Sequence, residues 1–85
     1  MIHPMPMIPK QQYHSFRGAL GTDIPDTYDE WLNLTNKLRN ERIRQGEVVP
    51  QVEIDFDEFT RFCAARGTTP NNKALLDLAI EKSRR

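Results

Sequence analysis

This sequence of 85 residues has a single cysteine, no net charge and no long apolar run, and each of these features excludes a class of protein. Its single cysteine, Cys63, excludes a disulfide within the chain and favours a reducing, cytoplasmic setting. Twelve cations balance twelve anions, so the chain has no general attraction for nucleic acid or for an anionic membrane. No apolar run approaches the length of a membrane span, and the proline-broken N-terminus does not resemble a secretory signal. We therefore expect a small cytoplasmic protein with no membrane partner.

Motifs for chemistry are also missing from the sequence. It has no glycine-rich phosphate loop, no CxxC pair and no Gly-x-Ser-x-Gly turn. The carboxylates between residues 53 and 58 lack the dense ligand set and turn glycine of a loop that binds a hard cation. Cys63 has no histidine nearby in the sequence, which favours a buried, unreactive thiol. We expect no catalytic residue, no metal and no cofactor, and hence a protein that is not an enzyme.

The N-terminal segment predicts an extended arm over residues 1–26, ahead of a small helical domain over residues 27–85. Pro4, Pro6 and Pro9 exclude a regular helix and a central strand where they occur. The apolar side chains of this arm would be costly to leave in water. We therefore expect residues 5–8 or residues 13–16 to lie against the helices or against a partner chain.

The strongest helix signal covers residues 27–45. Thr27 and Glu30 have the spacing of a capping box, and Gly46 stands where a left-handed residue would end the helix. Trp31, Leu34 and Leu38 follow one another at intervals of three and four, which predicts one apolar stripe that faces the core.

A strand and two further helices are predicted after this long helix. Residues 48–55 alternate, with Val52 and Ile54 on one side and polar residues on the other. Asp55 then caps a second helix that ends at Gly67. A third helix begins after a cap at Thr69 or at Asn71. The predicted fold is thus mainly α: a three-helix domain with one short strand and an extended, proline-rich arm. Its predicted core comprises Trp31, Leu34, Leu38, Phe59, Phe62, Leu75 and Leu78.

The distribution of charge favours a protein partner. Residues 46–67 carry five anions and two cations, whereas residues 68–85 carry four cations and two anions. An acidic segment, an apolar arm that needs cover and the lack of catalytic motifs together predict stoichiometric binding to another protein, as by an adaptor, an inhibitor or an antitoxin-like factor. A homodimer remains open. The predicted partner-binding residues are Glu53, Asp55, Asp57, Met5, Met7 and Ile8.

An alternative function follows from the order of elements between Gln51 and Lys82. Strand, helix, glycine turn and capped helix resemble the ribbon-helix-helix repressors, which pair one strand from each of two chains in the major groove of DNA. That resemblance implies a dimeric DNA-binding regulator in which Gln51, Glu53 and Asp55 face the bases. Two of these three residues are anionic and would lie in the negative field of DNA, so the protein-binding interpretation is preferred.

Overall fold

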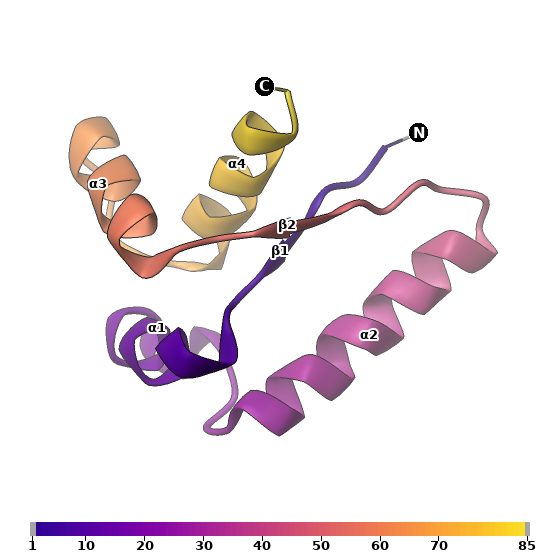
Figure 1. Cartoon of the computed structure of the whole chain (residues 1–85), viewed down its shortest axis with the longest axis horizontal. Helices are drawn as coiled ribbons and strands as arrows, with labels where there is room; N and C mark the ends of the chain where they lie inside the picture. The colour runs from indigo at the N-terminus through magenta and orange to yellow at the C-terminus, as the bar shows by residue number, and fades with distance from the viewer. Residues whose placement is uncertain (1, 85) are drawn as a thin grey trace.

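The computed structural model describes residues 2–84 and is mainly helical, with one small parallel sheet (Figure 1). The strands are β1 (Met5–Met7) and β2 (Gln51–Glu53). The α-helices are α1 (Tyr13–Leu20), α2 (Tyr28–Arg44), α3 (Phe56–Arg66) and α4 (Asn72–Ser83). Short 3-10 turns, η1 (Lys10–Gln12) and η2 (Gly21–Asp23), flank α1.

The N-terminal segment differs from the predicted arm. Only its first part is extended, where Met5 pairs with Gln51 and Met7 pairs with Glu53 in parallel register. After Pro9 the chain turns into α1, which the sequence analysis did not predict, so the described residues form four helices instead of three. The sequence analysis expected residues 5–8 or residues 13–16 to lie against the helices or against a partner chain. In the structure Tyr13, Phe16 and Leu20 are buried on one face of α1. Residues from both sides of position 26 share one hydrophobic core.

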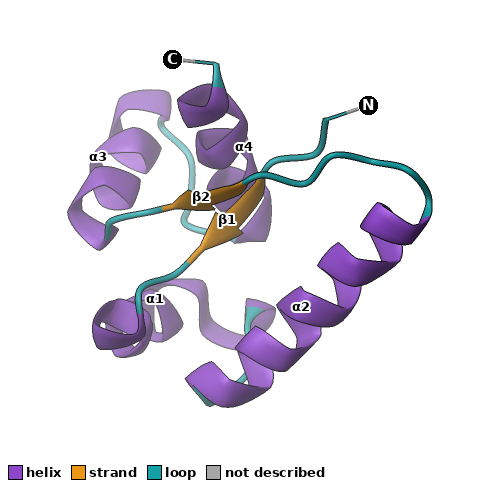
Figure 2. Ribbon diagram, turned by 45° about the vertical axis from the view of Figure 1, so that its right-hand side comes forward, coloured by secondary structure: helices purple, strands orange, loops and turns teal. Residues whose placement is uncertain are grey.

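The two strands lie between α4 and α2 (Figure 2). The amides of His3 and Met5 donate to the carbonyls of Val48 and Pro50, and the amide of Ile54 donates to the carbonyl of Met7. The strand β2 is shorter than the predicted strand over 48–55, but the side chains along it and at Ile54 alternate as predicted. Val52 is half-buried and Ile54 is buried, while Gln51 and Glu53 are exposed. A parallel pair needs a long connection between its strands, which α1 and α2 provide.

The helix α2 begins and ends as the sequence predicts. The hydroxyl of Thr27 accepts the amide of Glu30, which is one half of the predicted capping box. At the other end, Gly46 has a φ of 86° and its amide donates to Ile43. The amide of Glu47 donates to Arg42, which completes a Schellman stop.

The two C-terminal helices are also capped by side chains. Asp55 accepts the amides of Asp57 and Glu58 at the start of α3, and Gly67 ends that helix in the left-handed region, with a φ of 64°. At α4 the two rival caps are resolved in favour of Asn71, whose side chain accepts the amide of Ala74. Thr69 and Pro70 precede the helix.

The core is formed mainly by aromatic and aliphatic side chains from α1, α3 and α4. Phe16 packs edge-on against Phe56 and at a tilt against Phe59, with ring centroids 5.1 and 5.5 Å apart. Trp31 is buried as predicted and lies 6.0 Å from Tyr13, between ring centroids. The buried cluster comprises Ile8, Tyr13, Phe16, Leu20, Ile24, Trp31, Ile54, Phe59, Cys63, Ala74, Leu75, Leu78 and Ala79.

Two residues of the predicted core were assigned wrongly. Leu34 and Leu38 are 54% and 55% exposed, whereas Thr35 beside them is buried. The stripe on α2 exists, but neighbouring elements cover only its Trp31–Thr35 flank. Phe62 is only partly buried and packs at the edge of the core. No helix within residues 2–84 is both long enough and apolar enough to cross a membrane.

Candidate functional site: an apolar groove and an acidic edge

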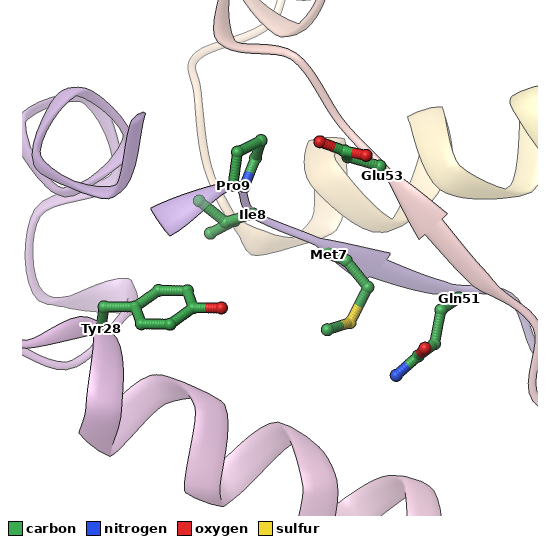
Figure 3. A pocket seen from close by; sticks show the side chains of 6 residues that line it. All are labelled: Met7, Ile8, Pro9, Tyr28, Gln51 and Glu53. Carbon is green, nitrogen blue, oxygen red and sulfur yellow. The ribbon is translucent and has the colours of Figure 1, made fainter. Parts of the chain in front are cut away.

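The open face of the sheet forms one hollow of about 370 Å³ beside the start of α2. In Figure 3, the side chains of Met7 and Gln51 point from the strands toward α2, and the hydroxyl of Tyr28 points toward Met7. Glu53 also lines the hollow, but in this view its carboxylate lies across β1 from α2. The hollow offers a phenol, an amide and a thioether, a set suited to contact with a polar or apolar side chain of a ligand.

Asp55, one of the predicted partner-binding residues, is used within the fold. Its Oδ1 accepts the side-chain amide of Gln12 at 2.8 Å, and its Oδ2 accepts the amides of Asp57 and Glu58. The hydrogen bond from Gln12, followed by those from the two backbone amides, holds the pKa of Asp55 below its ordinary value. This carboxylate is therefore primarily a helix cap.

Glu53 and Asp57 are exposed, and within residues 2–84 their carboxylates have no hydrogen-bond or ion-pair partner. The neighbouring cation, Lys82, donates to the backbone carbonyl of Glu53 and to the carboxylate of Glu58, both at 2.8 Å. Glu53 and Asp57 are thus the two predicted acids whose charge stays available at the surface. We call these two residues, with Asp55 between them in the chain, the acidic edge.

The three predicted apolar residues of the N-terminal segment line two different hollows. Ile8 is 2% exposed and belongs to the core, although it also lines the hollow beside Tyr28. Met7 lines the hollow beside Tyr28, and Met5 lines a separate groove between α2 and α4. Of the six predicted residues, Met7, Ile8 and Glu53 thus line one hollow, and Met5 lines another.

The groove that Met5 lines lies between two helices. We call it the α2–α4 groove. One wall carries Leu34 and Leu38 of α2, the other carries Leu75 and Leu76 of α4, and Met5 and Pro6 of β1 form its floor. The polar residues that line it are Asp23, Thr35 and Asn72. Its volume is about 330 Å³, and Leu76 is itself 43% exposed. Three leucines from two helices thus meet solvent around one concave site.

A second apolar hollow continues this surface past Leu76, which lines both. Its volume is about 820 Å³, and it lies between the end of α4 and the paired segments before the two strands. Ile2 and Val48, two of the most exposed apolar side chains, face this hollow together with Ile80. Together, the groove and the hollow form an exposed apolar surface of a kind that marks interaction sites on soluble proteins.

Groups for nucleophilic or metal chemistry do not gather in the described residues. No cluster of three or more histidine, cysteine, aspartate or glutamate side chains that could hold a metal ion occurs among residues 2–84. Cys63 is buried, and that burial raises the pKa of its thiol.

The strand of the alternative, DNA-binding interpretation is paired within the chain. β2 runs parallel to β1, which occupies one of its edges. Its other edge is approached by two cations, since Arg39 donates to the carbonyl of Val49 and Lys82 donates to that of Glu53. A two-chain ribbon would have to form on this second edge.

Comparison with known proteins adds no relative: no family model, no curated protein and no solved structure matches the chain. Leu34, Leu38 and Leu76 are the site residues that sequence reasoning missed. Leu34 and Leu38 belong to an apolar stripe and were interpreted as core, whereas Leu76 was assigned neither to the core nor to a site. Only the placement of the helices shows which flank of each stripe stays uncovered.

Proposed function

We propose that this chain is a small, non-enzymatic binding protein that forms a stoichiometric complex with a protein partner, as an adaptor, inhibitor or antitoxin-like factor does. The observation that carries the proposal is the α2–α4 groove, where Leu34 and Leu38 face Leu76 across a concave apolar site. Exposed leucines cost free energy in water, and because these three are only about half exposed, a partner that covers them recovers about half of the roughly 1.5–3 kcal/mol for burying a whole side chain.

The acidic edge supports the same function at the rim of the complex. Glu53 and Asp57 keep carboxylates at the surface, on the part of the chain that carries the local excess of negative charge. Charges at a rim steer association and select partners more than they add affinity. The groove would supply affinity, and the acidic edge would contribute to specificity.

The DNA-binding alternative has less support. A ribbon-helix-helix dimer requires strands paired between two chains, and β2 is three residues long, has one edge paired with β1 and displays Glu53. Its residues would face the negative field of the phosphates.

A pull-down of protein partners from the source cell, with the tagged chain as bait, tests the proposal. The full chain, tagged through a long flexible linker, is used as wild type, as Leu38→Ser and as Ile43→Ser. Ile43 is a matched control because it is 44% exposed on the same helix but does not line the groove. We expect a partner at fixed stoichiometry with wild type and Ile43→Ser, and its loss with Leu38→Ser. Equal recovery with all three would contradict the proposal, provided that the variants unfold at similar denaturant concentrations.

A further inference from the structure

The backbone at the floor of the α2–α4 groove decides what kind of segment can lie there. Residues 3, 5 and 7 direct their backbone groups to β2: the amides of His3 and Met5 donate, and the carbonyl of Met7 accepts. The alternate positions direct their backbone groups to the outer edge of β1, because the groups of successive residues in a strand point in opposite directions. Pro4 and Pro6 occupy those positions and carry no N–H.

An added strand would therefore find no backbone donor at either proline on this edge. Proline on an exposed edge is a known means of preventing strand addition. An α-helix, by contrast, satisfies its own backbone hydrogen bonds and needs only side-chain contacts from a groove. The floor of the groove thus favours a helix over an extended peptide.

The walls present apolar side chains at helical intervals. Leu34 and Leu38 are one turn apart on α2, and Leu76 and Ile80 are one turn apart on α4, with Ile80 in the continuing hollow. A bound helix that carries apolar residues at positions i, i+3 or i+4, and i+7 would place these side chains between the apolar side chains of the two walls.

The charge around the walls selects the polar face of that helix. Of the cations of α2 after Leu34, Arg39 donates to the carbonyl of Val49 and Arg42 pairs with Glu47, which leaves Lys37 and Arg44. The charged side chain that lines the groove itself is Asp23, whose Oδ2 accepts the amide of Asn72. Lys37 follows Leu34 by three residues and so borders the same wall, and within the described residues it has no ion-pair or hydrogen-bond partner. Arg84 lines the continuing hollow.

We propose that the α2–α4 groove binds an amphipathic helix of the protein partner, with acidic residues beside its apolar stripe. This inference rests on the proposed function and specifies the ligand of the same site. A second copy of the chain is the alternative occupant, and the oligomeric state of the wild type tests it.

Selection from a phage library of random 18-residue peptides tests this inference on the full chain. We expect enriched peptides to show apolar residues at helical spacing with aspartate or glutamate beside them. Their binding should weaken about tenfold or more in Leu38→Ser and in Leu76→Ser, and should be unchanged in Ile43→Ser.

Enrichment of peptides with alternating apolar residues, of basic peptides, or of peptides indifferent to Leu38→Ser and Leu76→Ser would overturn the inference. It would leave the proposed function standing if the cell-derived partner still depends on Leu38. Dimerisation of the wild type that Leu38→Ser abolishes would also overturn it, in favour of a second copy as the occupant.

Charge reversal gives a second readout that does not depend on packing. Lys37→Glu should weaken an enriched acidic peptide about two- to fivefold at low salt, and this difference should shrink as salt rises. Lys10→Glu is the control, because Lys10 is exposed and lies outside the groove. Equal effects of the two reversals would overturn the acidic part of the inference.

Discussion

Gln12 and Asp55, which are 43 residues apart in the chain, are joined in the structure by a hydrogen bond of 2.8 Å. The same Gln12 side chain accepts the amide of Phe56, also at 2.8 Å. One side chain from the segment expected to be an arm thus binds both the cap and the first residue of α3. This contact ties the N-terminal residues to the acidic edge.

The Gln12–Asp55 hydrogen bond should make stability depend on pH in the acid range. Because the pKa of folded Asp55 is lowered, the contribution is fully present above the unfolded pKa of about 3.9 and is lost as the pH falls through the folded pKa. We expect Gln12→Ala to raise the pKa of Asp55, measured by NMR titration of its carboxyl carbon. Gln11→Ala, at the exposed neighbour, should leave it unchanged. An unaltered pKa in Gln12→Ala would show that the backbone amides alone lower it.

Truncation of leucines on α2 should barely change stability, unlike truncation in the core. Leu34→Ala and Leu38→Ala remove side chains that are more than half exposed, so each should cost no more than about 0.5 kcal/mol in denaturant unfolding. Phe16→Ala removes a fully buried ring and should cost about 3–5 kcal/mol. A decrease of several kcal/mol in the free energy of unfolding for both variants would show that Leu34 and Leu38 belong to the core.

The cap of α4 should be Asn71 and not Thr69. Asn71→Ala removes the acceptor of the Ala74 amide and should cost about 1 kcal/mol. Thr69→Ala, two residues earlier, removes a side chain that is exposed in the loop and should have almost no effect. Comparison of the two denaturant midpoints checks the assignment, and the reverse order of effects would contradict it.

Hydrogen exchange should show that the N-terminal segment is ordered in the unbound protein. The amides of Met5 and Ile54 donate across the sheet at 2.9 Å, so they should exchange slowly. Thr69, in an exposed loop, is the comparison and should exchange rapidly. Rapid exchange at Met5 and Ile54 as well would mean that β1 detaches from β2 in solution.

The sequence predicted those parts of the fold that depend on local chemistry. The bounds of α2 follow from Thr27 and Gly46, and the start of α3 follows from Asp55, because caps act on amides within a few residues. The alternation of Val52 and Ile54 likewise predicted the buried side of β2. These elements need no information from the rest of the chain.

What the sequence did not predict depends on tertiary contacts. Pro4, Pro6 and Pro9 suggested an extended arm, and that interpretation hid the helical spacing of Tyr13, Phe16 and Leu20 immediately after them. The groove was missed for a related reason. An apolar stripe shows that a helix has a face to cover, but the choice between Thr35 and Leu38 depends on where other elements lie.

The central claim is that the partner covers the α2–α4 groove, and methyl NMR with the partner recovered from the source cell tests it most directly. On addition of that partner to methyl-labelled protein, the signals of Leu34, Leu38 and Leu76 should shift or broaden. Those of Leu78, which is buried, and of Ile43, which lies outside the groove, should change little. Changes confined to the amides of Glu53 and Asp57, with the three groove leucines unaffected, would contradict the account and place the partner on the acidic edge.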